Sequence, residues 1–383
     1  MNKIKSLMIA MMAIIAGVSF TACDDDDDTP SNNYTVYQNA VNQTVKQQKK
    51  HDKVILLVAF GSTWQQAFEA FDTTIEAYKN DARFKDYDVF LSYSSAICIN
   101  RAAAGENAAD GAEVRNYYAP PFWLTAFAQE GVRYSELVVQ SLQVIPGEEY
   151  TRVINYIKDF ANNSNGDIND EYLANVTLKL GVPLLQDKDE DVNAVADALD
   201  ALYGDKATTD VVAFMGHGNP DSYDTYKANI RYTQLEEALQ AKGKNFFVGT
   251  VDMMENFKTH VYDRMKAAGL NDGTRKVYCH PLMSIDGDHG HNDMAGDDLP
   301  EGIDEENYTL AQLLALANEE GEVEDCSWKP FFNAEGSGFT CNNETMIEKG
   351  LLELPTVRAI WMKHTKAAID GEALDYYHSK NPE

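Results

Sequence analysis

The sequence has 383 residues, of which 44% are hydrophobic, so it is long enough for one large domain or two of ordinary size. Its formal net charge of -29 argues against a nucleic-acid partner, because phosphate binding requires clustered Lys and Arg. The acidity is compatible with attraction of cations, although a soluble surface is its more common meaning.

The N-terminus has the features of an export signal. Two lysines precede an apolar stretch from Leu7 to Val18, and small residues then lead to Cys23. We interpret residues 1–22 as a signal peptide, because the apolar stretch is too short and too early for a membrane span of the mature protein. The ending FTAC resembles the lipobox of bacterial lipoproteins, with Phe20 in place of the usual Leu. Cys23 is therefore the expected site of lipid attachment.

The sequence DDDDDTPSNN follows Cys23. A run of like charges repels itself and stays extended, so residues 23–50 are predicted to be a lipidated Cys and an acidic tether. The run also resembles an acidic signal that sends some bacterial lipoproteins to the cell surface, and a plain solubilising linker is the alternative. The predicted location is exported and lipid-anchored to the outer membrane, on its periplasmic or cell-surface side.

Strand-like and helix-like segments alternate through the first predicted half, residues 51–188. Apolar runs of strand length occur at residues 53–60, 87–94, 135–145 and 175–185. Helical spacing of apolar residues occurs at residues 63–81 and again in the segment GEEYTRVINYIKDF. Four strands separated by helices predict a parallel sheet that is covered on both faces.

The same alternation repeats in the second predicted half, residues 189–383. Strands are predicted at residues 210–218, 245–252 and 275–285, and helices at residues 191–203, 231–243, 257–269 and 354–370. The expected fold class is α/β, with two similar halves that each hold a parallel sheet of about four strands flanked by helices. Two segments break the alternation: residues 100–122 look loop-like, and an acidic insertion with one short helix lies at about 299–324.

Four cysteines follow Cys23. Cys326 and Cys341 are the expected pair if a disulfide forms outside the cytoplasm, because both lie in a polar, Gly-rich region. Cys98 and Cys279 lie in apolar runs and are predicted to be buried thiols. No CxxC pair occurs in the sequence, which disfavours thiolate zinc sites and redox pairs.

Three predicted strands of the second half end in side chains that can bind a metal. DVVAFMGHG ends near His217, NFFVGTVD ends at Asp252, and RKVYCHPLMSI is followed by His289 and His291. Ligands of open parallel sheets bind at the carboxyl ends of the strands. Two imidazoles and a carboxylate suit Zn²⁺, Fe²⁺, Co²⁺ or Ni²⁺ better than Ca²⁺ or Mg²⁺. Each His alone could be an ordinary loop residue bonded to an Asp, but their convergence at one sheet edge favours a metal site.

Seven segments carry a resemblance to a known family: ILLVAFGST, VVQSLQVIPGEEY, LGVPLL, VVAFMGHG, VGTVD, PLMSIDGDHGHNDMAGDD and LPTVRAIWMKH. In this order they resemble the anaerobic cobalt chelatases of cobalamin biosynthesis, which are sirohydrochlorin cobaltochelatases related in fold to ferrochelatase. The similarity spans about residues 54–368, interrupted by the acidic insertion. MGHG and GDHxxNDMAxDD together are specific to this family, whereas either motif alone would be weak.

The resemblance implies two ferrochelatase-like halves with a tetrapyrrole in the cleft between them. By position, it implies that His217, Asp252 and His289 bind the divalent metal and that His217 also accepts a proton, with Asp252 as a second catalytic group. Asp252 stands where the family has Glu, so the ligand arm is one methylene shorter. His291 has no counterpart in the family pattern, and it could substitute as a ligand or be a helix-start residue facing water.

The first half departs from the family pattern at positions expected to face the macrocycle. Gln143 stands where members commonly carry His, and Ala96 stands where some carry Arg. Tyr118, Phe122 and Trp123 could stack on a macrocycle, and packing under a loop is the favoured alternative.

The function implied by the resemblance is insertion of Co²⁺, or Fe²⁺, into a sirohydrochlorin-like tetrapyrrole, with Ni²⁺ as a further candidate metal. The export signal favours another interpretation, because sirohydrochlorin is made inside the cell and its eight carboxylates are not attracted by an acidic chain. This alternative is an exported lipoprotein that binds haem or another tetrapyrrole and could remove its metal. A purely binding protein is a third interpretation. The expected partners are a tetrapyrrole, the membrane through Cys23, and a second copy of the chain if it forms a homo-oligomer.

Overall fold

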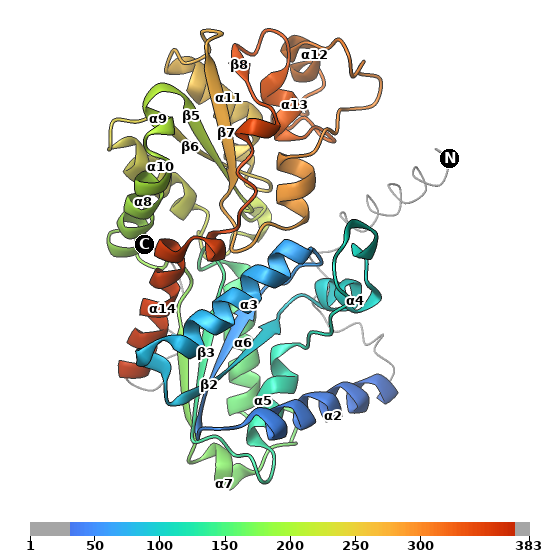
Figure 1. The fold of residues 1–383 in the computed structure, drawn as a ribbon, viewed down its shortest axis with the longest axis vertical. Helices are drawn as coiled ribbons and strands as arrows, with labels where there is room; N and C mark the ends of the chain where they lie inside the picture. The colour runs from blue at the N-terminus through green and yellow to red at the C-terminus, as the bar shows by residue number, and fades with distance from the viewer. Residues whose placement is uncertain (1–30, 372–383) are drawn as a thin grey trace.

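The computed structural model describes residues 31–371 (Figure 1). It contains two four-stranded parallel sheets, with strand orders β2-β1-β3-β4 and β6-β5-β7-β8. The predicted α/β fold class with two similar halves is confirmed. The predicted signal peptide, Cys23 and the acidic run that follows it lie outside the described residues.

The first sheet is a fully covered parallel sheet. Its strands are β1 (Lys53–Ala59), β2 (Tyr87–Tyr93), β3 (Glu136–Ser141) and β4 (Thr177–Gly181). One face packs against α3 (Gln65–Asn80) and α14 (Pro355–Asp370). The other face packs against α2 (Ser31–Gln48), α5 (Pro120–Ala128) and α6 (Glu148–Ala161). Coverage on both sides explains why these strands are nearly continuous apolar runs instead of alternating ones.

The second sheet has the same construction. Its strands are β5 (Val211–Gly216), β6 (Phe246–Thr250), β7 (Arg275–Pro281) and the two-residue β8 (Phe339–Thr340). One face packs against α8 (Glu190–Tyr203) and α10 (Ile230–Gln240), and the other against α11 (Lys258–Ala267) and α13 (Trp328–Asn333). The remaining short helices are α4 (Ala96–Ala104), α7 (Asp170–Leu173), α9 (Lys206–Thr209) and α12 (Leu310–Leu314). β8 was not predicted, because two residues are too few to show a period.

The C-terminal helix α14 corrects the predicted division of the chain. The sequence places it in the second half, but it packs on β3 and β4 of the first sheet, beside α3 (Figure 1). Trp361 is fully buried there and donates its indole N–H to the backbone oxygen of Gln143 at 3.2 Å. The Thr365 hydroxyl donates to Gln140 Oε1 at 2.8 Å. Helix α14 therefore lies on the first sheet, and one hydrophobic core contains buried residues of both halves.

Helix α2 corrects the predicted tether, which was expected to extend to residue 50. Val41 and Val45, one turn apart, are completely buried against α5 and the first sheet. Gln38 donates its side-chain N–H to the backbone oxygen of Phe122 at 3.0 Å. The packing of this apolar stripe stabilises the helix. The helix was not predicted because the stretch is polar and its residues have low helical propensity.

Two further expectations are tested by the fold. The segment predicted as loop-like, residues 100–122, begins within α4 and ends within α5, so only its middle is irregular. The Ser95 hydroxyl caps α4, and Pro120 occupies the first turn of α5, where a missing N–H costs nothing. The acidic insertion contains the one short helix predicted, α12.

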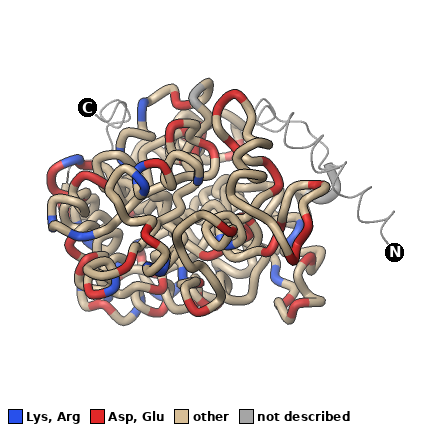
Figure 2. Tube along the Cα trace, turned by 90° about the horizontal axis from the view of Figure 1, so that it is seen from above, with Lys and Arg blue, Asp and Glu red and all other residues tan. Residues whose placement is uncertain are grey.

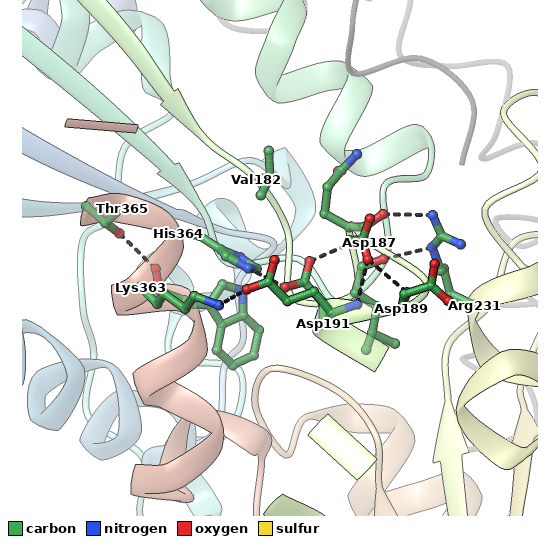
Figure 3. A network of polar contacts seen from close by, with 12 residues as sticks. Val182, Asp187, Asp189, Asp191, Arg231, Lys363, His364 and Thr365 are labelled. Atoms are coloured by element: carbon green, nitrogen blue, oxygen red, sulfur yellow. Dashed lines mark hydrogen bonds and ion pairs between the residues drawn. The ribbon is translucent and has the colours of Figure 1, made fainter. Parts of the chain in front are cut away.

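The segment between β4 and α8 connects the first half to the second, and side chains from α10 and α14 form hydrogen bonds with it and with the start of α8 (Figure 3). Arg231 of α10 donates to the backbone oxygens of Leu185 and Gln186 at 3.0 and 2.7 Å. His364 of α14 donates its Nε2–H to the buried carboxylate of Asp191 at 2.9 Å. Charge-assisted bonds from two helices fix the backbone at this crossing.

The four cysteines that the structure describes are all free thiols. The predicted pair of Cys326 and Cys341 is wrong in this structure, because Cys341 Sγ lies 3.9 Å from Cys279 Sγ. Cys326 instead contacts the backbone oxygen of Ser327 at 3.6 Å. The prediction of Cys279 as a buried thiol is confirmed, and Cys98 is half-buried.

None of the helices within residues 31–371 combines the length and the apolar composition needed to cross a lipid bilayer.

Candidate active site

The structure brings His217, Asp252 and His289 to one edge of the second sheet. β5 lies between β6 and β7, and each of the three residues follows one of these strands at its carboxyl end. The ring centroids of the two histidines are 4.8 Å apart, with their planes nearly perpendicular at 83°. Asp252 Oδ2 lies 3.4 Å from His217 Nδ1. The parallel topology thus produces the convergence that strand order predicts.

His217 is held by the turn that follows β5. Its Nδ1 lies 2.8 Å from the backbone oxygen of Gly218. Because a carbonyl oxygen only accepts, Nδ1 must carry the proton, and Nε2 then has a free lone pair for a metal or a proton. Gly218 has φ of 78°, and a Cβ there would lie 3.1 Å from the backbone of Met253, so the turn requires glycine.

His289 is oriented by the π-helical turn His289–Met294, a rare element that often occurs at functional sites. Its Nδ1 lies 2.5 Å from Asp293 Oδ2, one turn further along the chain. Burial would lower the pKa of His289, but the hydrogen bond to Asp293 and the charges of Asp252 and Asp288 outweigh it, so the pKa is raised. Nδ1 donates to the carboxylate, and Nε2 is again the free atom. A carboxylate behind a ligating imidazole is the usual arrangement in metal sites.

Asp252 lies on the Nδ1 side of His217, whereas the lone pair that can bind a metal is on Nε2. Within residues 31–371, no three His, Cys, Asp or Glu side chains are already gathered around one point at coordinating distance. The structure therefore shows two imidazoles, His217 and His289, whose Nε2 atoms are free. The carboxylate of Asp252 lies beside His217 and helps to orient its ring.

A cavity of about 1020 Å³, including the part open to solvent, lies between the two halves and contains His217 and His289 in its wall. The first half contributes residues that follow β1 and β3 and residues of α4, and the second half contributes residues that follow β5 and β7. Apolar side chains cover most of the wall. Because both halves contribute to the wall, a ligand in this cavity would contact both of them.

Glu149 is a site residue that our reading of the sequence missed. It lies in the first turn of α6, lines the cavity, and faces the histidines from the opposite half. Burial raises the pKa of its carboxyl, and the charges of His217, Arg152 and His289 oppose that rise. His217 was predicted because it is a polar residue that directly follows a parallel strand. The same rule applied to the segment IPGEEY after β3 would have identified Glu149.

One of the two alternatives for His291 was a helix-start residue that faces water, and this alternative is wrong. His291 stacks on Trp64 of the first half, with ring centroids 3.9 Å apart and an interplanar angle of 20°. Its Nε2 lies 3.5 Å from Asp286 Oδ2, a completely buried carboxylate. The Trp64 indole N–H also donates to Asp288 Oδ1 at 2.5 Å, so Trp64 connects the two halves beside the cavity.

The positions that depart from the family pattern divide into two groups. Gln143 lines the cavity and is buried, whereas Ala96 is exposed at the start of α4. Tyr118, Phe122 and Trp123 do not line the cavity. They form an aromatic cluster with Tyr34, Tyr37 and Phe90, on the sheet face covered by α2. The three residues therefore pack in the protein, but under helix α2 instead of under a loop.

Comparison with known proteins gives a consistent result. A family model described as Cobalt chelatase (CbiK) matches residues 53–308, which is well over half of the chain. The chain is 27% identical over 320 residues to the sirohydrochlorin cobaltochelatase of Salmonella typhimurium (strain LT2), covering 83% of this chain and 97% of that protein. It is 25% identical to the sirohydrochlorin cobaltochelatase CbiKC of Nitratidesulfovibrio vulgaris (strain Hildenborough), covering 83% of this chain and 91% of that protein.

Among solved structures, SirB from Bacillus subtilis with Fe³⁺ covers 83% of this chain and 96% of its own, at 14% identity and a TM-score of 0.47.

A two-halved α/β fold with paired imidazoles in the cavity between the halves suits a metal chelatase, a lyase that works on a tetrapyrrole. The chain belongs to the cobalt chelatase family.

Proposed function

We propose that this enzyme inserts Co²⁺ into a sirohydrochlorin-like tetrapyrrole held in the cavity, with Fe²⁺ as the alternative metal substrate. The observation that carries the proposal is the pair of imidazoles, His217 and His289, whose backbone and carboxylate partners leave both Nε2 atoms free. The names of the two relatives support the choice of metal and macrocycle.

The proposed chemistry follows from what insertion demands. A divalent metal enters the ring only when two pyrrole N–H protons leave, so the site must hold a cation and accept protons at neutral pH. His217 Nε2 helps to hold the metal, and once the metal passes to the ring the same atom accepts a proton; its Nδ1–H stays with Gly218, and Asp252 stabilises the imidazolium that forms. His289, whose Nδ1–H is held by Asp293, binds the incoming metal through Nε2 together with His217. Glu149, on the opposite wall, balances charge as the metal enters.

The experiment uses the protein from Ser31 onward, kept anaerobic. Absorbance spectra would follow metal-free sirohydrochlorin with Co²⁺ or Fe²⁺ for the wild type and for His217→Ala, with His260→Ala as a control His on the surface. We expect fast metallation in the wild type and the control, and a loss of at least 100-fold in His217→Ala. Equal rates in wild type and His217→Ala would refute the assignment.

A second candidate function is supported by the charge of the molecule and by the N-terminal sequence. A chain at -29 does not attract a substrate with eight carboxylates over long range, whereas haem carries only two. We propose that Cys23 is lipidated and that the protein is exported and anchored at the outer membrane. There it would bind haem or a related tetrapyrrole and release its metal. A stable haem spectrum, or slow loss of iron, without metallation of sirohydrochlorin would favour this function over Co²⁺ insertion.

A further inference from the structure

Asp286 is a buried carboxylate that no hydrogen bond satisfies. It lies in the segment between β7 and the π-helical turn, and its side chain is completely buried. Neither of its two oxygens accepts a hydrogen bond from any residue between 31 and 371. Buried carboxylates are normally paired or coordinate a cation, because an isolated charge away from water is costly. Asp286 therefore calls for a positively charged partner.

His291 is the group closest to forming such a partnership. Its Nε2 lies 3.5 Å from Asp286 Oδ2 and, among the described residues, also has no hydrogen-bond partner. An N–H···O hydrogen bond is shorter, at about 2.7–3.2 Å. Two ligands of one tetrahedral ion, each about 2.0–2.2 Å from it, lie roughly 3.3–3.6 Å apart. The separation of the two atoms thus fits two ligands of one ion better than a hydrogen-bonded pair.

Packing holds both groups in place. Trp64 of the first half stacks on the His291 ring, with ring centroids 3.9 Å apart. A Cβ at Gly290 would lie 1.6 Å from Asp286 Oδ1, so only glycine lets the π-helical turn come this close to the carboxylate. The His291 side chain is 20% exposed, so an ion can reach it from solvent. The two groups are therefore fixed in advance at a place that an ion can enter.

The charges around Asp286 also favour a cation. Burial raises the pKa of Asp286 to about 7, and the charges of Glu348 and Glu353 add to the rise. Glu353 already accepts from the Gly350 N–H at 2.8 Å, whereas Glu348 is exposed and its charge acts on His291 as well. Glu348 is thus placed to supply a third ligand. Acidic residues cover the whole molecule with fewer basic ones among them, which attracts divalent cations to the protein (Figure 2).

We propose that Asp286 and His291 hold a second divalent cation, of the class that includes Co²⁺ and Zn²⁺, outside the cavity. An imidazole and a carboxylate suit these ions better than Ca²⁺ or Mg²⁺. Neither Asp286 nor His291 lines the cavity, so this ion is separate from the one proposed at His217 and His289. The inference goes beyond the proposed function and does not depend on it, because the second site needs no tetrapyrrole.

The test is binding of Co²⁺ alone, measured as metal content after equilibrium dialysis. The cavity site is first removed in a double variant, His217→Ala with His289→Ala. Asp286→Asn or His291→Phe is then added to this double variant. Asn keeps the volume of the Asp286 side chain, and Phe keeps a ring at the position that stacks on the indole.

His260→Ala, added to the same double variant, is the matched control for loss of a His on the surface. Matching circular dichroism spectra would show that all variants are folded.

We expect the wild type to bind Co²⁺ at both sites and the double variant to retain it at the second site. Loss of outer-shell partners already costs about 10–100-fold in metal affinity, so Asp286→Asn and His291→Phe should each cost at least about 100-fold at this site. His260→Ala should cost nothing. Co²⁺ should raise the melting temperature of the double variant but not that of the variants without Asp286 or His291.

The inference is overturned if the double variant binds no Co²⁺, or if its affinity for the remaining ion is unchanged by Asp286→Asn and by His291→Phe. Both outcomes leave the proposed function standing, because that function uses the cavity site at His217 and His289.

Discussion

At the scale of single residues, the site depends on what lies behind each imidazole. A backbone carbonyl fixes His217 and a carboxylate fixes His289, and in both cases the Nδ1 atom is occupied. The sequence motifs identify the two histidines but not these partners. Asp293 is one of five acidic residues between Met283 and Asp298, and only the π-helical turn selects it as the partner of His289.

Asp293→Asn should change the pH dependence of Co²⁺ binding. In the wild type the raised pKa of His289 keeps the imidazole protonated to higher pH, and the metal must displace that proton, so binding weakens as pH falls through this pKa. Removing the carboxylate lowers the pKa, and the midpoint of the binding profile should move to lower pH. The affinity at high pH should fall about tenfold, because the imidazole becomes less basic. Co²⁺ titrations between about pH 5 and 8 would measure both effects, and an unchanged midpoint would contradict the role given to Asp293.

Asp252→Glu should strengthen the site. Asp252 Oδ2 lies beside His217 Nδ1, and Glu, which the resemblance gives as the family residue, would extend the carboxylate by one methylene. We expect a several-fold gain in Co²⁺ affinity for Glu and a loss of about tenfold for Asp252→Ala, measured by calorimetry. Wild-type affinity in both variants would show that this carboxylate has no part in metal binding.

At the scale of the elements, the strands and helices that build the sheets were largely predictable, and the parts that cross between layers were not. Buried parallel strands can be recognised in the sequence as runs of apolar residues, as in β1 and β5. The packing of α14 on the first sheet could not be predicted in this way. An amphipathic helix can cover either sheet, and its position is set by tertiary contacts. The proximity of Cys341 to Cys279 could not be predicted from the sequence either. The composition around Cys341 indicates a polar segment, but it does not show which strand lies next to β8, the strand that precedes Cys341.

Oxidation should join Cys279 to Cys341. When the protein is refolded in a mixture of reduced and oxidised glutathione, the two thiols would give two protons and two electrons to the glutathione disulfide. We expect two alkylatable thiols to disappear and a crosslinked peptide with both cysteines to be found by mass spectrometry. Cys326→Ser should keep this crosslink. A peptide that joins Cys326 to Cys341, or four free thiols throughout, would show that the closeness of the two sulfurs has no chemical consequence.

At the scale of the whole molecule, the shared core should make the two halves unfold together. Trp361→Ala removes a fully buried indole and its bond to the backbone oxygen of Gln143, and should lower the free energy of unfolding by about 3–5 kcal/mol. Denaturant unfolding followed by circular dichroism should show one transition at a lower midpoint, while the surface control Lys363→Ala should change little. Two separate transitions in the wild type would mean that α14 does not unite the halves.

The central claim is that one divalent metal binds in the cavity through His217 and His289. Anomalous diffraction at the cobalt edge, from crystals grown with Co²⁺, tests it most directly. The account predicts one peak near both Nε2 atoms, at about 2.1 Å from each, and its loss in His289→Ala. A peak beside Asp286 and His291 instead, or a cavity peak that persists without His289, would contradict it.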